Sequence, residues 1–244
     1  MSHEQKQPKI LGIITARGGS KGIPGKSVKK LGDKPLIAYT IDVAKKSTLL
    51  THLIVSTDSE EIAYVCKEYG VDVPFMRPKE LAEDTTPHLP VVQHAVDFME
   101  KKESSIYDSV VILQPTSPFR TVDDIDATVQ KLIDADADSA VSMCEIEGDA
   151  HPMKMKKMEG DKVLPYVIEE TTTLRQELPV VYKRNSAVYV IKRDVVMKEN
   201  RLFLDGKIVG HLVPKERSLD IDVPLDWIEA EYTLGELKKK GYEF

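Results

Sequence analysis

Residues 16 to 30 combine glycine with positive charge at a spacing that could hold a phosphate group. Its four glycines would let backbone N–H groups approach an anion closely, because glycine has no side chain. The stretch contains no acidic residue, and its positive charges are Arg17, Lys21, Lys26, Lys29 and Lys30. It is therefore a candidate phosphate-binding loop. Glycine and lysine alone would equally fit a solvated surface loop.

Two common nucleotide-binding motifs nearly fit this loop but fail on spacing. A Walker loop needs a glycine five residues before Gly25, where the sequence has Ser20. The dinucleotide fingerprint ending at Gly22 needs a glycine at the position of Arg17. The spacing therefore favours neither an ATPase nor an NAD enzyme.

Asp220 and Asp222 are a second candidate for chemistry. If their segment ends a strand, both carboxylates point to one side and Leu219 and Ile221 point to the other. Two neighbouring carboxylates repel each other unless a cation lies between them. Mg²⁺ typically takes one or two carboxylates and leaves its other positions to water and substrate phosphates. The pair therefore predicts a magnesium site.

A third candidate is the proline-containing stretch 113–121, whose two prolines indicate a rigid loop. Gln114 could contact a base edge, and Ser117 and Arg120 could hold phosphate or only cap the next helix. Thr116 and Thr121 fit a helix-initiating turn equally well.

Strands and helices must alternate to place these loops together. Apolar runs predict strands at 10–16, 52–58, 71–76, 109–113, 140–145 and 209–213. Apolar residues at helical spacing predict helices at 35–46, 59–69, 90–102, 122–135 and 225–240. This alternation predicts an α/β fold with a Rossmann-like, mostly parallel sheet and helices on both faces. The candidate loops would then share the edge where such sheets bind ligands.

The pattern changes at about residue 151. A short hairpin is expected at 153–168, followed by a long β-rich run at 180–191. We therefore predict an α/β domain of residues 9–150 and 188–244, an inserted subdomain of residues 151–187, and a flexible N-terminal tail of residues 1–8.

Composition argues against some classes of function. The net charge of −6 argues against a nucleic-acid or membrane-surface partner. No apolar run approaches a membrane span or a signal peptide, so a cytoplasmic location is expected. The two cysteines, Cys66 and Cys144, lie far apart and are expected to be reduced structural thiols.

The motifs together resemble those of the acylneuraminate cytidylyltransferases, also called CMP-sialic acid synthetases. The resemblance covers nearly the whole chain and rests on five stretches in the family's order: Ala16-Arg-Gly-Gly-Ser-Lys-Gly22, Arg77-Pro-x-Glu-Leu-Ala-x-Asp-Thr85, Leu113-Gln-Pro-Thr-Ser-Pro-x-Arg-Thr121, His151-Pro-x-Lys154 and Ser218-x-Asp-Ile-Asp222. It implies transfer of CMP from CTP to a nine-carbon 2-keto sugar acid with magnesium. It also implies a fold like that of the nucleotide-diphospho-sugar transferases and a homodimer built on the small subdomain.

The resemblance also implies roles for individual residues. Arg17, Lys21 and Lys26 would hold the triphosphate, and Asp220 and Asp222 would bind Mg²⁺; of these, Arg17, Lys21, Asp220 and Asp222 would be catalytic. The remaining substrate contacts would come from Ser27, Arg77, Gln114, Lys154, Arg175 and Asn185, with Lys154 and Arg175 meeting the sugar carboxylate or a phosphate.

The sequence departs from the family at two positions. Ser27 follows Lys26 where the family commonly has Asn, and Lys183-Arg-Asn-Ser-Ala187 replaces the usual Arg-Pro-Asn-Gly-Ala. Three alternatives stay open: a cytidylyltransferase for the eight-carbon acid Kdo, a glycosyltransferase, and a nucleotide-binding regulator without catalysis. In glycosyltransferases the acidic pair lies mid-chain, whereas here it is near the carboxyl end.

Overall fold

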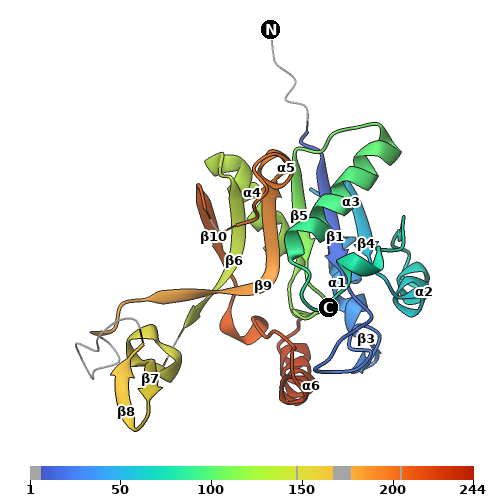
Figure 1. Ribbon diagram of the computed structural model, residues 1–244. Helices are drawn as coiled ribbons and strands as arrows, with labels where there is room; N and C mark the ends of the chain where they lie inside the picture. The colour runs from blue at the N-terminus through green and yellow to red at the C-terminus, as the bar shows by residue number, and fades with distance from the viewer. Residues whose placement is uncertain (1–6, 147, 167–176, 204) are drawn as a thin grey trace.

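The computed structural model describes residues 7–146, 148–166, 177–203 and 205–244, and is built on one six-stranded sheet (Figure 1). The strand order is β10-β6-β9-β5-β1-β4. Neighbouring strands are parallel, except that β9 runs antiparallel to both β5 and β6. The predicted α/β fold with a mostly parallel sheet is therefore confirmed.

The elements follow the predicted alternation. The sheet strands are β1 (Ile10–Thr15), β4 (His52–Ser56), β5 (Ser109–Leu113), β6 (Ser139–Ile146), β9 (Val181–Lys192) and β10 (Ile208–Leu212). The helices are α1 (Leu36–Ala44), α2 (Glu60–Glu68), α3 (His88–Glu103), α4 (Val122–Ala135), α5 (Arg193–Met197) and α6 (Pro224–Lys239). Within the described residues, no helix is both long and apolar enough to cross a membrane.

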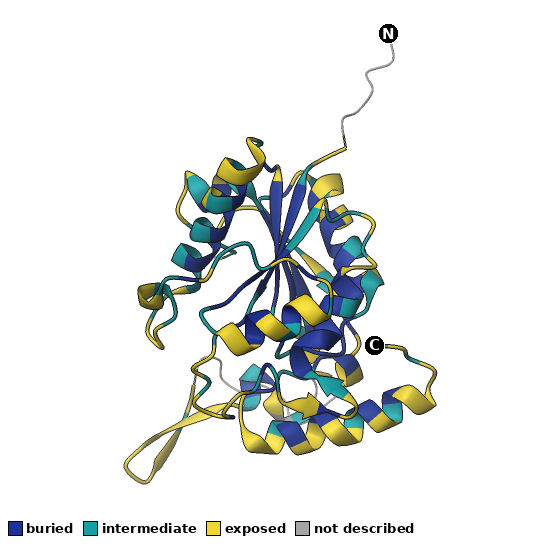
Figure 2. Ribbon diagram, turned by 90° about the vertical axis from the view of Figure 1, so that its right-hand side faces the viewer, coloured by how far each residue is buried: buried dark blue, intermediate teal, exposed yellow. Residues whose placement is uncertain are grey.

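Helices cover both faces of the sheet because its central strands are apolar on both sides. In β1, Ile10 and Ile14 pack with α1, α2 and α4, while Leu11 and Ile13 pack with α3 and α5. The sheet is the dark, buried layer between exposed helix surfaces in Figure 2. Because both faces are covered, the site can lie only at an edge of this sheet.

Helix α6 packs below the sheet on a third apolar cluster. Trp227 and Leu234 of α6 meet Ile23 from the basic loop, Phe119 from the proline-containing loop and Ile221. This cluster joins three of the candidate loops to one helix, so it fixes them relative to one another.

The strand predicted at residues 71–76 is absent from the structure. These residues make only isolated bridges, from Asp72 to Ile54 of β4 and from Met76 to Thr57, which follows β4. Residues 218–222 form no strand; one turn, Lys215–Arg217, precedes them, and the Ile221 N–H donates to the Thr116 carbonyl at 2.9 Å. The short helix α5 and the two-residue strands β2 (Lys30–Leu31) and β3 (Lys34–Pro35) were not predicted.

The long strands β6 and β9 extend from the sheet toward a separate hairpin (Figure 1). The hairpin consists of β7 (Lys156–Glu159) and β8 (Lys162–Pro165), which pair with each other in a two-stranded sheet. It agrees with the short hairpin expected there. Strand β9 crosses the boundary predicted at residue 187 without a break. The predicted tail falls mostly on residues 1–6, outside the described residues.

Strand β9 leaves the sheet at an irregular point. Its register with β6 shifts between Val141 and Met143, and Ser186 has a φ of 62°. This left-handed conformation costs an L-residue about 1–2 kcal/mol, whereas glycine adopts it freely. Ser186 is also where the family stretch commonly carries glycine.

We expect Ser186→Gly to raise the free energy of unfolding by about 0.5 kcal/mol. The relief of the left-handed conformation should exceed the extra chain entropy that glycine gives the unfolded state. Urea denaturation would measure it. Ser186→Ala is the matched control because it keeps the backbone penalty; a gain as large in that variant would contradict the explanation.

Candidate active site

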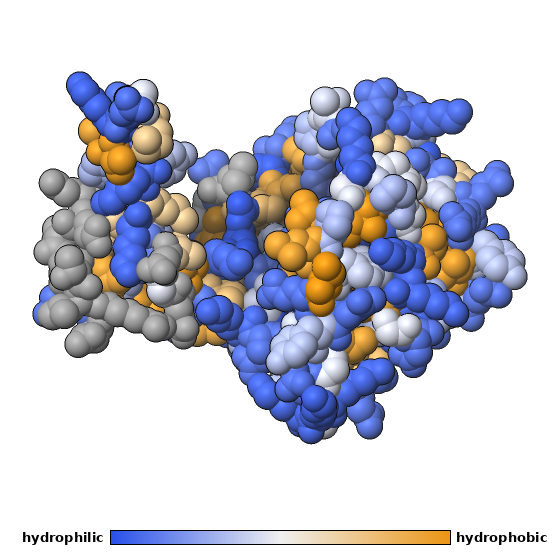
Figure 3. Space-filling model, turned by 90° about the horizontal axis from the view of Figure 1, so that it is seen from below, coloured by the Kyte–Doolittle hydropathy of each residue, from blue (hydrophilic) through white to orange (hydrophobic). Residues whose placement is uncertain are grey.

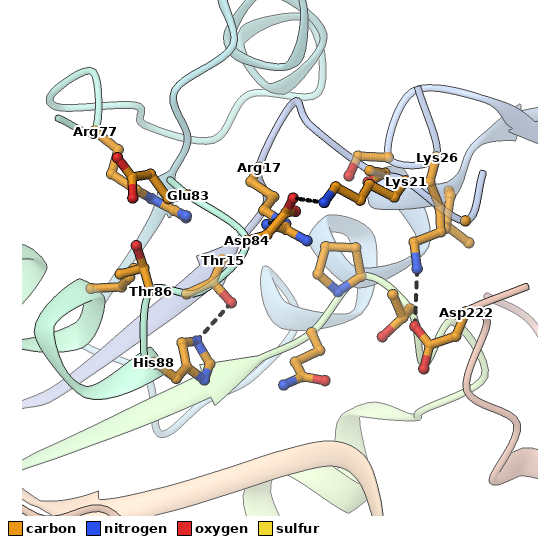
Figure 4. Close-up of a pocket in the computed structure, with 18 of the residues that line it drawn as sticks. Thr15, Arg17, Lys21, Lys26, Arg77, Glu83, Asp84, Thr86, His88 and Asp222 are labelled. Atoms are coloured by element: carbon orange, nitrogen blue, oxygen red, sulfur yellow. Dashed lines mark hydrogen bonds and ion pairs between the residues drawn. The ribbon is translucent and has the colours of Figure 1, made fainter. Parts of the chain in front are cut away.

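A cleft of about 500 Å³ opens at the carboxyl ends of the parallel strands. Its walls come from the end of β1, the basic loop, the loop that follows Arg77, the start of α3, the loop after β5 and the segment 220–222. In Figure 4, Thr15 and His88 lie at one end, Lys26 and Asp222 at the other, and Arg17, Lys21 and Asp84 between them. The structure therefore brings the three candidate loops together, as predicted.

The middle of the cleft carries the first two cations of the basic loop. Arg17 Nη1 lies 2.7 Å from Asp84 Oδ1, and Lys21 contacts the other oxygen of the same carboxylate. The hydrogen bond from Lys21 and the nearby charge of Arg17 hold the pKa of Asp84 below its usual range. Two cations that bind the two oxygens of one carboxylate could bind a phosphate in its place.

Lys26 links the basic loop to the acidic pair. Its Nζ donates to the Ile221 carbonyl at 2.6 Å and to Asp222 Oδ1 at 3.1 Å, and the side chain is largely buried. Gly22 makes the second link, because a Cβ built there would lie 2.2 Å from the Asp222 carbonyl oxygen. The loop and the acidic pair are thus in direct contact at this end.

Asp220 supplies a direct test of whether a metal ion fits. Both Asp220 and Asp222 line the cleft. Oδ1 of Asp220 is buried and has no hydrogen-bond partner among the residues that the structure describes, which is costly for a carboxylate oxygen. A divalent cation would satisfy this oxygen, so the donor set fits Mg²⁺. No cluster of three or more His, Cys, Asp or Glu forms among the described residues, so water and phosphate would complete the shell.

The opposite end of the cleft is polar and well buried. Arg77 donates through Nε to Ser56 Oγ at 3.0 Å, and burial lowers its pKa to about 10, so it stays charged at neutral pH. His88 lies 3.1 Å from the Thr15 hydroxyl, and burial, with help from Arg77, lowers its pKa to about 4. A charged donor and a neutral imidazole suit an uncharged ring with donors and acceptors, such as a nucleobase.

Two further predicted residues line the same cleft. Ser27 is buried beside Lys26, and Gln114 is half-buried at the end of β5. Both bring uncharged side chains to the cleft. Their positions suit uncharged parts of a substrate, and their roles stay predictions.

Comparison with known proteins agrees with this geometry. Residues 11–209 match the sequence family described as cytidylyltransferase. The chain belongs to the cytidylyltransferase family. It is 34% identical over 225 residues to the CMP-N,N′-diacetyllegionaminic acid synthase of Legionella pneumophila, an alignment that covers 91% of this chain and 95% of that one. It is 30% identical to the N-acylneuraminate cytidylyltransferase of Escherichia coli over 95% of this chain, but spans only 53% of that longer protein.

The fold is also shared with a solved structure. The structure of CMP:2-keto-3-deoxy-manno-octonic acid synthetase in complex with CTP aligns with a TM-score of 0.69 and covers 94% of this chain and 99% of that one. The sequence identity is 17%, so this similarity concerns the fold alone.

In this cytidylyltransferase, the buried residues of the proline-containing loop are structural. Arg120 is fully buried, where it donates to the carbonyls of Ala187 and Gln114 and to Thr40. Ser117 donates to the Asn185 carbonyl at 3.2 Å. Neither residue can reach a phosphate in the cleft. Thr121 caps α4 in a reciprocal capping box with Asp124, so the alternative of a helix-initiating turn is correct there.

Asn185 lies behind the wall of the cleft. Its Oδ1 accepts from Ser142 Oγ at 2.6 Å and its Nδ2 donates to Ser218 Oγ at 3.0 Å. The side chain is buried and is not among those that line the cleft. Its hydrogen bond to Ser218 supports the segment that carries Asp220, and its contact with substrate stays a prediction.

Two predicted residues belong to the inserted subdomain. Lys154 lies in the 3-10 helix Pro152–Lys154, before the hairpin, and does not line the cleft of its own chain. Arg175 lies outside the described residues. Their contact with the sugar, from the same chain or from a partner, stays a prediction.

The cytidylyltransferase cleft includes two residues that sequence reasoning did not assign to a site. Asp84 lay inside a quoted motif, but its pairing with Arg17 and Lys21 depends on loops distant in sequence. His88 lies outside the motifs quoted above. Its place at the start of α3, next to a loop carrying Arg77, is the signal that could have indicated it.

Proposed function

We propose that this protein transfers CMP from CTP to a nonulosonic acid, a nine-carbon 2-keto sugar acid, and releases pyrophosphate. The observation that supports this most strongly is the meeting of the basic loop and the acidic pair at Lys26 and Asp222, in one cleft at the carboxyl edge of the sheet. Relatives at 30–34% identity are named for CMP-sugar synthesis from legionaminic and acylneuraminic acids.

The cationic residues of the cleft would offset the negative charges of the two substrates during this reaction. The sugar hydroxyl attacks the α-phosphorus and gives up its proton to a general base, a new P–O bond forms, and the bond to the pyrophosphate oxygen breaks. Because the sugar brings a carboxylate toward a triphosphate, fixed cations must offset the repulsion. Arg17 and Lys21 would hold the outer phosphates, and Lys26 would hold the phosphate nearest the acidic pair. Their cradle would also stabilise the charge on the leaving pyrophosphate.

Asp220 and Asp222 would hold Mg²⁺ in this proposal. When bound, the ion would neutralise charge on the phosphate oxygens and orient the triphosphate. Lys26 beside Asp222 keeps that carboxylate in place, and the Ile221 N–H bond to Thr116 keeps the segment against the loop after β5.

The other end of the cleft would receive the cytosine. Arg77 can donate to ring acceptors, and the neutral His88 imidazole can accept from or donate to a ring edge. Ser27 and Gln114 would contact uncharged parts of the nucleotide or the sugar. Figure 4 shows Arg77 and His88 at one end of the cleft and Lys26 and Asp222 at the other, so the base and the metal ion would lie apart.

Pyrophosphate release tests the proposal directly. The purified protein would be incubated with CTP, Mg²⁺ and, separately, sialic, legionaminic, pseudaminic and Kdo-type acids. We expect release with at least one nonulosonic acid, and none with CTP alone. Turnover with Kdo only would favour the eight-carbon alternative, and binding of CTP without turnover of any acid would favour a regulator.

We also propose that the protein is a homodimer built on the inserted subdomain. An isolated two-stranded hairpin is marginally stable, and β7 and β8 expose Met158 and Val163. The main body also exposes apolar side chains, among them Leu225 and Ile228 of α6. On its underside, orange side chains lie among hydrophilic ones (Figure 3). Exposed apolar side chains that gather in a patch are typical of interaction sites.

Sedimentation velocity would measure the oligomeric state at assay concentration. We expect a dimer, and we expect Met158→Asp with Val163→Asp to shift it toward monomer because charge would enter the interface. Leu225→Asp tests whether α6 also contributes. A fully active monomer of the unaltered protein would contradict the proposal.

A further inference from the structure

Asp84 is the only carboxylate in the described part of the chain that pairs with both Arg17 and Lys21 of the basic loop. It lies between the 3-10 helix Lys79–Leu81 and α3. The loop around it is held by its own bonds: the Thr86 hydroxyl donates to the Glu80 carbonyl at 2.9 Å, and the Thr86 N–H donates to the Glu83 carbonyl at 3.2 Å. Figure 4 shows the carboxylate facing Arg17 and Lys21 across the cleft. The loop is therefore formed with this charge directed at the cations.

One carboxylate and a polyphosphate cannot share these two cations. Like charges at hydrogen-bond distance repel strongly in a cleft that is partly shielded from water. Asp84 contacts Arg17 with one oxygen and Lys21 with the other, as two oxygens of a phosphate chain would. A polyphosphate that binds there must therefore move Asp84 away.

We propose that Asp84 is a specificity-determining residue that holds the position of a substrate phosphate until a polyphosphate displaces it. This inference rests on the proposed function, in which that polyphosphate belongs to CTP. A ligand then binds only if it contacts both cations better than Asp84 does, which disfavours ligands with a single phosphate. The same competition promotes release of pyrophosphate after the reaction, because Asp84 returns as the product leaves.

Calorimetric titration with inorganic tripolyphosphate tests the inference without nucleotide or sugar. We expect Asp84→Asn to bind tripolyphosphate roughly three- to tenfold more tightly than the unaltered protein, the scale of two partly exposed ion pairs. Asp136→Asn is the matched control. Asp136 is exposed and pairs with Lys192 at the other edge of the sheet, so its replacement changes the net charge equally. The Asp136→Asn variant should bind tripolyphosphate with the affinity of the unaltered protein.

A second variant, Lys21→Met, tests whether the tighter binding of tripolyphosphate depends on the paired cations. In Lys21→Met protein, Asp84 keeps only Arg17, so the gain from Asp84→Asn should shrink. Unchanged or weaker tripolyphosphate binding in Asp84→Asn would overturn the inference. So would a fall in kcat at saturating CTP with unchanged tripolyphosphate affinity, because Asp84 would then act in the reaction itself.

The two proposals fail separately. If Asp84→Asn binds tripolyphosphate more tightly but the unaltered protein turns over none of the acids, this inference stands and the proposed function is wrong. Normal turnover, with no change in tripolyphosphate affinity on replacing Asp84, would do the reverse.

Discussion

Replacing Asp222 with alanine is expected to lower kcat by more than about a hundredfold, the scale of lost transition-state charge stabilisation. Asp222 lies at the junction of the acidic pair and the basic loop, where it pairs with Lys26. The CTP affinity should fall much less, because Arg17 and Lys21 do not depend on this carboxylate. Initial rates of pyrophosphate release at saturating CTP and sugar acid would measure the loss.

Asp220→Ala separates the proposed metal role from the contact with Lys26. Asp220 makes no bond to Lys26, and its buried Oδ1 has no partner of its own. If the two carboxylates bind one metal ion together, kcat should fall by a similar factor in Asp220→Ala. Asp97→Ala on the exposed face of α3 is the control, since it removes only a surface pair with Lys101. Equal turnover of the unaltered enzyme in excess chelator would contradict the magnesium proposal.

Local sequence signals predicted most elements of the sheet domain. Strand β5 and helix α4 begin and end at the predicted residues. Both have a strong pattern: β5 is apolar from Val110 to Leu113, and α4 is preceded by Thr121, which forms a capping box with Asp124 three residues later. The carboxyl edge of the sheet was predictable for the same reason, because parallel strands place their following loops together.

Elements that depend on tertiary contacts were predicted less well. Residues 71–76 are apolar enough for a strand, but they form only two isolated bridges, one to Ile54 of β4 and one to Thr57 just after it. Residues 218–222 alternate like a strand, yet Ile221 is held by the Thr116 carbonyl and the apolar cluster under α6. Periodicity reports which side chains are buried, not which backbone groups pair.

The candidate site was also predicted only where its residues cluster locally in the sequence. The cations of the basic loop and the acidic pair were visible as local clusters. Asp84 and His88 were not, because a single carboxylate or imidazole gains meaning only from the distant residues beside it. For Asn185, the motif position suggested a substrate contact, which stays a prediction; the structure shows its amide bridging Ser142 and Ser218.

Gly22→Ala is expected to lower kcat/KM by about a hundredfold through geometry alone. The added Cβ would lie 2.2 Å from the Asp222 carbonyl oxygen, and a backbone atom cannot rotate away as a side chain can. The basic loop and the acidic pair must then separate, and a displacement of about 1 Å between reacting groups can cost this much. Pyrophosphate release would measure the loss, and thermal unfolding would show that the variant still folds.

Gly19→Ala is a control within the same loop. A Cβ built at Gly19 meets no atom within 4 Å, so the substitution adds the same methyl group without moving the segment that carries Asp222. Its activity should stay within about threefold of the unaltered enzyme, because it leaves the cations and the acidic pair in register. Equal losses in the two variants would mean that loop flexibility matters, and not the contact between Gly22 and Asp222. Full activity in Gly22→Ala would mean that the two segments can separate without harm, which would argue against a rigid junction between the phosphate-binding loop and the acidic pair.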